Sequence, residues 1–159
     1  MGNYPVNLAH YSREELERVI SHQIHHSQFS KLSEVHIPLS IFSTRIPPLA
    51  ALARYLNEER KLSPSEIADR LGRKPSTISS ALNRGRKQLP LSFPGHAEFY
   101  IPLIKLRKTR QSIMETVILH LDSSGLSLTD MARMLGRSIK TIHTWKSRAR
   151  NKSSPTLGW

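Results

Sequence analysis

The chain has 159 residues, no cysteine, and 24 Lys and Arg against 12 Asp and Glu. Without cysteine, a disulfide framework and a thiolate metal site are excluded. The sequence shows no basic stretch followed by a long apolar run, so we expect no signal peptide. It also shows no run of about 18 apolar residues, so we expect no membrane span. The net charge of +12 instead predicts a polyanionic partner such as nucleic acid.

The basic excess lies in the last two thirds of the chain. Residues 1–36 carry three basic and four acidic residues, for a net charge of −1. Residues 37–100 carry ten and five, for +5, and residues 101–159 carry eleven and three, for +8. We therefore look for the binding surface after residue 36.

Residues 13–28 predict an amphipathic helix. Ser12 and Glu15 form a capping-box pattern, and apolar residues follow at helical spacing. This segment is not basic, so we expect it to pack on the rest of the chain, to form a homodimer or to contact another protein partner. His22 and His26 lie one turn apart, but no cysteine can complete a structural zinc site, and we expect no metal and no cofactor.

An internal repeat organises the rest of the chain. Ile37-Pro38-Leu39 recurs as Ile101-Pro102-Leu103, an offset of 64 residues. The same offset maps residues 62–87 onto 126–151 with ten identical pairs, and between these blocks the offset is 65. Two units are too few for a solenoid, so they indicate a duplicated module.

The repeat divides the chain into five segments. We predict an N-terminal helical segment at 1–36, a first repeat at 37–87 and a second repeat at 101–152. Residues 88–100 contain two prolines and a glycine and form the predicted linker, and residues 153–159 form a tail.

Each repeat predicts a short apolar opening followed by three helices. The openings, residues 37–46 and 101–110, contain a proline, and we expect each to be extended, as a single short strand. The first helix has apolar residues at positions i, i+3, i+4 and i+7. These are Leu49, Leu52, Ala53 and Leu56 in the first repeat and Met114, Val117, Ile118 and Leu121 in the second.

The second helix begins at a capping serine and ends at a glycine. Ser63 with Glu66 makes a capping box, and Ser127 with Asp130 repeats the pattern with a shorter acid. Gly72 and Gly136 supply the left-handed residue that ends the helix. The third helix is predicted over about residues 75–86 and 139–150.

This spacing is typical of a helix-turn-helix. The turn needs a glycine, a small residue is needed four positions earlier, and apolar residues must face inward on both helices. The first repeat supplies Ile67, Ala68, Leu71, Gly72, Ile78 and Ala81; the second supplies Met131, Ala132, Leu135, Gly136, Ile142 and Trp145. The predicted fold class is all-α, with two tandem three-helix helix-turn-helix modules after an N-terminal amphipathic helix.

Both repeats also contain a longer pattern: a capped helix, an "IA..LG" turn, a Thr-Ile pair and a trailing Arg-x-Arg. These motifs are Ile67-Ala68, Leu71-Gly72, Thr77-Ile78 and Arg84-Gly85-Arg86 in the first repeat, and Met131-Ala132, Leu135-Gly136, Thr141-Ile142 and Arg148-Ala149-Arg150 in the second. In this respect residues 62–87 and 126–152 resemble region four of bacterial sigma factors. The resemblance covers about fifty residues and implies that the third helix enters the major groove and that RNA polymerase is a further partner. Nothing resembles sigma region two, so we do not expect a complete sigma factor.

The third helices therefore carry the predicted DNA-binding residues. Residues expected to face base edges are Lys74, Ser76, Ser79, Ser80 and Asn83 in the first repeat and Ser138, Lys140, His143, Thr144 and Ser147 in the second. Thr77 and Thr141 are placed to bond a phosphate. Predicted backbone clamps are Arg84, Arg86, Lys87, Lys146, Arg148, Arg150 and Lys152. Small hydroxyl side chains predict modest sequence specificity, and the larger charge of the second repeat predicts that it contributes more to binding.

These features are compatible with three functions. The leading one is a cytoplasmic, nucleoid-associated protein that binds double-stranded DNA as a transcriptional regulator or DNA-organising protein. A structural or adaptor protein, with the modules used for protein contacts, is the alternative. RNA binding is less favoured because aromatic residues are few. No catalytic grouping is visible, so we expect no enzyme activity and no membrane association.

Overall fold

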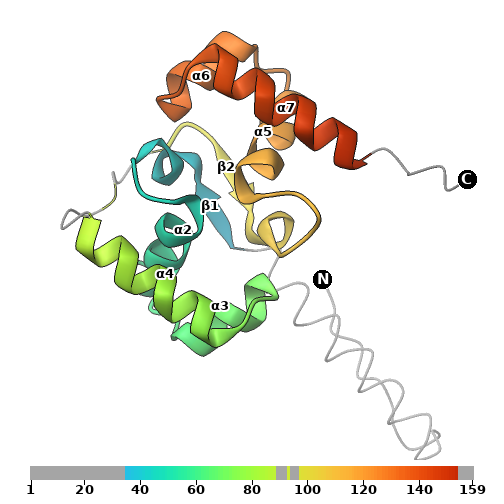
Figure 1. Ribbon diagram of the computed structural model, residues 1–159. Coiled ribbons are helices and arrows are strands. Elements are labelled where there is room, and N and C mark those ends of the chain that lie inside the picture. The colour runs from blue at the N-terminus through green and yellow to red at the C-terminus, as the bar shows by residue number, and fades with distance from the viewer. Residues whose placement is uncertain (1–34, 89–92, 94–96, 154–159) are drawn as a thin grey trace, which may run out of the picture.

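The computed structural model describes residues 35–88, 93 and 97–153, and this part of the chain is mostly helical (Figure 1). The predicted helix at residues 13–28, and with it the expected homodimer or partner contact, lies outside the described residues. None of the helices within the described ranges is both long and apolar enough to cross a membrane.

The two repeats contain the same elements in the same order. Over the first repeat these are β1 (His36–Pro38), the 3-10 helix η2 (Leu39–Ser43), α2 (Pro48–Glu58), α3 (Pro64–Leu71) and α4 (Pro75–Gln88). Over the second they are β2 (Tyr100–Pro102), the 3-10 helix η3 (Leu103–Leu106), α5 (Ile113–Ser123), α6 (Leu128–Leu135) and α7 (Ile139–Ser153). The third helices, α4 and α7, continue two to three residues beyond the predicted ends.

The openings of the repeats are extended for only three residues each. Pro38 and Pro102 keep extended backbone angles, and the chain then tightens into a 3-10 turn. Proline cannot donate a ladder hydrogen bond, so it suits the end of a short strand. The predicted strands are therefore present, but they are shorter than the predicted segments.

Capping fixes where the second helices begin. Ser63 Oγ accepts from the Glu66 amide, and the Glu66 carboxylate accepts from the Ser63 amide at 2.8 Å, which confirms the predicted capping box. Ser127 also caps α6, but the shorter Asp130 accepts from the Ser127 hydroxyl at 2.6 Å rather than from its amide. A capping box that was not predicted, Ser112 with Glu115, begins α5.

Glycines end the second helices as predicted. Gly72 and Gly136 have φ of 61° and 58°, in the left-handed region. At Gly136 the nearest atom to an added Cβ would be the Ser43 carbonyl oxygen at 3.6 Å, an ordinary contact. A side chain would therefore fit there, and only the backbone conformation disfavours one.

We expect Gly136→Ala to lower the free energy of unfolding by about 1–2 kcal/mol, because alanine resists the left-handed conformation. Gly136→Asn should cost less, since asparagine tolerates this conformation better. Urea unfolding followed by circular dichroism measures both. Equal losses in the two variants would mean that space, not backbone conformation, requires the glycine.

The strands of the two repeats pair with each other. β1 and β2 are antiparallel, with Ile37 opposite Ile101, His36 opposite Pro102 and Pro38 opposite Tyr100. Both isoleucines are fully buried. The ladder therefore lies at the centre of the described structure, where it joins the two repeats (Figure 1).

Each opening also packs on the other repeat. η2 contacts α6, and η3 contacts α3. The Lys108 amide donates to the Leu71 carbonyl at 2.8 Å, and Arg137 Nη2 donates to the Thr44 carbonyl at 2.8 Å. One hydrophobic core of buried residues consequently runs through both repeats.

The end of the predicted linker is part of the same body. The Phe93 ring packs edge-on against Tyr55 at 5.9 Å between centroids, and the Arg54 guanidinium lies over the Phe93 ring. The Phe99 carbonyl accepts from the Leu39 amide at 2.9 Å. The position of the second repeat is therefore set by packing, not by the reach of a linker.

Candidate nucleic-acid interface

The third helices of the two repeats lie on one face of the molecule. In Figure 1, α4 and α7 are both toward the viewer and run in opposite directions, so that α4 ends at the left and α7 at the right. α2 and α3 support α4 from behind, and α5 and α6 support α7. The buried positions Ile78, Ala81, Leu82 and Gly85 on α4, and Ile142 and Ala149 on α7, are the sides that face these supports.

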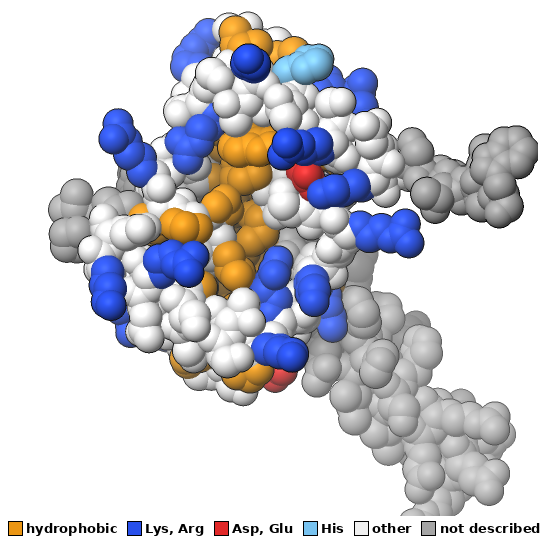
Figure 2. Space-filling model, viewed as in Figure 1, with side chains coloured by type: hydrophobic (Ala, Val, Ile, Leu, Met, Phe, Trp, Pro, Cys, Tyr) orange, Lys and Arg blue, Asp and Glu red, His pale blue; other side chains and the backbone are white. Residues whose placement is uncertain are grey.

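Basic side chains cover much of this face. Figure 2 shows Lys and Arg over both halves, few acidic side chains, and a strip of hydrophobic side chains between the halves. A polyanion would meet a positive potential over either third helix.

Most of the predicted base-facing residues are exposed. On and before α4, Lys74, Ser76, Ser79, Ser80 and Asn83 are all exposed, as is Thr77. On and before α7, Ser138, Lys140, His143 and Ser147 are exposed.

Two threonines of the second repeat differ from this pattern. Thr141 and Thr144 are half-buried. The Thr141 hydroxyl lies 2.9 Å from Ser138 Oγ, and the Thr144 hydroxyl donates to the Lys140 carbonyl at 2.8 Å. The first residues of α7 are therefore held by local hydrogen bonds, with Lys140, His143 and Ser147 left to face outward.

The two arginines of each Arg-x-Arg motif have different surroundings. Arg84 and Arg148 occupy equivalent positions of the two repeats, and both are exposed. Neither guanidinium forms a hydrogen bond or an ion pair with any of the described residues. Lys87, near the end of α4, is also exposed.

The second arginine of each motif contacts the end of the first helix of its own repeat. Arg86 Nη2 donates to Asn57 Oδ1 at 2.8 Å, and Arg150 Nη2 donates to Asp122 Oδ2 at 3.0 Å. Asn57 and Asp122 are themselves equivalent, at the offset of 65 residues. The sequence predicts that Arg86 and Arg150 clamp the DNA backbone; in the structure each connects two helices within the protein.

Lys146 is likewise paired within the protein. Its Nζ lies 2.6 Å from Asp122 Oδ1, and its side chain is only 20% exposed. Hydrogen bonds from Lys146, opposed by partial burial and reinforced by Arg150, hold the pKa of Asp122 below its ordinary value. Asp122 therefore stays ionised and offsets part of the positive charge of α7.

Lys152 pairs with a buried carboxylate. Its Nζ lies 2.8 Å from Glu115 Oε2, and Glu115 is 4% exposed. Burial raises the pKa of Glu115, but hydrogen bonds from Lys152 and the Ser112 amide outweigh it, and the net pKa lies below the ordinary value of 4.5. This pair attaches the end of α7 to the start of α5.

We expect Glu115→Gln to lower the free energy of unfolding at pH 7, because it removes the ion pair with Lys152. The loss should be only about 1 kcal/mol, since the Lys152 side chain is partly exposed and solvent screens the pair. Glutamine keeps the capping box. A carboxyl whose folded pKa is depressed stabilises the fold above its unfolded pKa and loses that contribution as the pH falls through the folded pKa. The difference between the two proteins should therefore shrink below about pH 4.5. Urea unfolding across this range measures it; a constant difference would contradict the ion-pair contribution.

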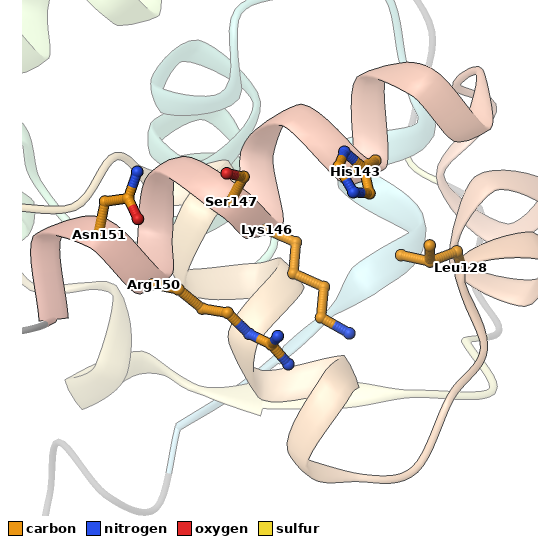
Figure 3. Close-up of a pocket in the computed structure, with 6 residues that line it drawn as sticks. All are labelled: Leu128, His143, Lys146, Ser147, Arg150 and Asn151. Carbon is orange, nitrogen blue, oxygen red and sulfur yellow. The ribbon is translucent and has the colours of Figure 1, made fainter.

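A depression on α7 brings several predicted residues together. It has a volume of about 360 Å³ and is lined by Leu128, His143, Lys146, Ser147, Arg150 and Asn151 (Figure 3). In Figure 3 the side chains of Lys146 and Arg150 extend from α7 in the same direction, toward the loop that precedes α6. Both side chains pair with Asp122, so the positive charge beside this depression is already partly offset within the protein.

Two basic residues of the second opening reach the first repeat. The Arg107 side chain packs over Gly72, and the Lys108 amide donates to the Leu71 carbonyl, so these two basic residues lie beside the turn that precedes α4. Sequence analysis assigned these charges to the second repeat. The larger net charge of the second repeat is therefore not a measure of the charge around α7.

Trp145 is partly buried and packs against the core, in agreement with the inward position that its spacing predicted. Asn57 and Asp122 are the residues that sequence analysis missed. The repeat could have indicated them, because both are polar residues that lie eight residues after the first apolar position of their helices, at equivalent places in the two repeats.

Comparisons with protein-family models, with curated proteins and with solved structures found no match to this chain.

Proposed function

We propose that this protein binds double-stranded DNA by inserting α4 and α7 into the major groove, as a transcriptional regulator or DNA-organising protein. Each repeat would act as a helix-turn-helix module, with α3–α4 and α6–α7 as the two-helix units. The observation that carries the proposal is the presence of both third helices on one basic face, each with an exposed polar first half.

The side chains fit such a role by position. An α-helix fits the major groove, and the residues early in the helix meet the base edges. On α4 these are Ser76, Ser79 and Asn83; on α7 they are Lys140, His143 and Ser147. Arg84 and Arg148 directly follow Asn83 and Ser147 in the chain, in the second half of each helix, where arginine side chains suit contacts with phosphates.

A second candidate function is that of an adaptor that binds another protein through the same face. The hydrophobic strip between the two halves in Figure 2 favours it, because apolar surface suits a protein partner better than a phosphate backbone. DNA binding is preferred because cations cover both halves of that face.

Fluorescence anisotropy with labelled duplex DNA, single-stranded DNA and duplex RNA of the same sequence tests the proposal. We expect duplex DNA to bind most tightly, with an affinity that falls steeply as salt increases, because bound cations release counterions. Arg133→Ala is the control for a general effect of charge, since it removes a charge from α6 rather than from a third helix and its side chain is 77% exposed. Equal binding of all three nucleic acids, or no loss of duplex affinity between low and physiological salt, would contradict the proposal.

A further inference from the structure

The β1–β2 ladder carries a symmetry that constrains how the two repeats can meet DNA. The offset of 64 residues converts His36 into Tyr100, and Pro38 into Pro102. The pair His36–Pro102 is thereby exchanged with the pair Tyr100–Pro38, and the pair Ile37–Ile101 is exchanged with itself. The contacts of the ladder are unchanged when the two repeats change places.

The hydrogen bonds that flank the ladder obey the same exchange. The Leu39 amide donates to the Phe99 carbonyl at 2.9 Å, and the Leu103 amide donates to the Val35 carbonyl at 2.8 Å. A relation that carries the first repeat onto the second, and the second back onto the first, is a two-fold rotation. If the second repeat were only shifted along an axis from the first, the same operation would not carry the second repeat back onto the first.

The third helices follow this rotation. In Figure 1, α4 and α7 lie on opposite sides of the ladder, run in opposite directions and are both toward the viewer, so the two-fold axis points out of the face that carries them. A duplex laid on that face has its own two-fold axes perpendicular to the helix axis. Recognition helices related by such an axis meet half-sites that are inverted relative to each other.

The two reading surfaces are nevertheless unequal. At equivalent positions, α4 offers Ser76, Ser79 and Asn83 where α7 offers Lys140, His143 and Ser147. Asparagine suits the N6 and N7 edge of adenine, whereas lysine suits the O6 and N7 edge of guanine. The half-sites that fit the two helices should therefore differ in sequence.

We propose that one chain of this protein recognises an imperfect inverted repeat in duplex DNA, with α4 and α7 on two different half-sites of opposite orientation. This inference rests on the proposed DNA binding and adds to it the arrangement and inequality of the half-sites. Because both helices belong to one chain, the protein has a preferred orientation on its site.

Selection of tight-binding duplexes from a random library, using the full chain, tests the arrangement. We expect the selected sequences to contain two dissimilar half-sites in inverted orientation, bound by one chain per duplex in native mass spectrometry. Turning one half-site to make a direct repeat, or scrambling it, should weaken binding at least about tenfold, since the second contact is intramolecular. Equal affinity for the direct repeat or for a single half-site would overturn this inference and leave DNA binding intact. Failure of every duplex to bind would overturn the proposed function as well.

A variant with matched reading helices tests the inequality. In Lys140→Ser/His143→Ser/Ser147→Asn, the three exposed positions of α7 that are assigned to base reading become those of α4. We expect the preferred site to become a perfect inverted repeat of the half-site read by α4. A melting temperature close to that of the unsubstituted protein would establish that the fold is kept. An unchanged preference for the original dissimilar site would overturn the assignment of these positions to base reading.

Discussion

Replacing Arg84 and Arg148 together by alanine is expected to weaken binding to duplex DNA about 30-fold at 0.15 M salt, with little effect on stability. Both guanidiniums are exposed and equivalent in the repeat. Each phosphate contact contributes about 0.9 to the slope of log affinity against log salt, so two lost contacts cost about 1.5 log units at this salt concentration. The salt slope itself should fall by about 2. Anisotropy titrations at several salt concentrations measure both quantities.

The matched comparison is Arg86→Ala/Arg150→Ala, which removes the same number of charges from the same helices. Because these arginines contact Asn57 and Asp122, we expect this variant to lower the melting temperature as well as the affinity. If the two double variants lost stability to the same extent, the distinction between outward and helix-connecting arginines would be wrong. If Arg84→Ala/Arg148→Ala bound DNA normally, neither third helix would meet the phosphates as proposed.

Replacing Ile37 by alanine is expected to lower the free energy of unfolding by about 2–5 kcal/mol, the usual cost of emptying a fully buried isoleucine site. We expect the loss to appear equally in both repeats, since Ile37 belongs to the first repeat but lies opposite Ile101 in the shared ladder. In a Trp159→Phe background, Trp145 becomes the sole tryptophan and reports on the second repeat. Its fluorescence and the far-ultraviolet circular dichroism should change at the same, lowered urea concentration.

Ile139→Ala is the control for this experiment. Ile139 begins α7 and is 49% exposed, so the same substitution should cost far less there. If the urea midpoint of the Trp145 fluorescence change were unaltered while the circular dichroism became biphasic, the two repeats would unfold independently. That result would contradict a shared core.

Local features of the fold were predictable from sequence because they depend on neighbours in the chain. Ser63 with Glu66 and the glycines at 72 and 136 require only a few residues to act, and all are present where their patterns placed them. The apolar spacing of α2 and α5 likewise identified the buried side of each helix.

The arrangement of the repeats was not predictable in this way. Each opening looked like part of its own repeat, and nothing in the local pattern around Ile37 indicates that its partner is Ile101. Separation in sequence likewise hid the pairing of Glu115 with Lys152, 37 residues apart, and of Asp122 with Lys146, 24 residues apart. Counting charges by segment therefore located the basic region but not which cations are paired or which helix they surround.

The crossing of the openings has a consequence for synthesis of the chain. η2 buries Leu39, Ile41 and Phe42, and it packs on α6, which is about ninety residues later. At about 5–20 residues per second, the ribosome leaves these side chains without the part of their cover that α6 supplies for about 5–20 s, although α2 of the same repeat also packs on η2. During that interval the first repeat is a nascent segment with an exposed apolar edge, and it becomes a complete folded unit only after the second repeat has emerged.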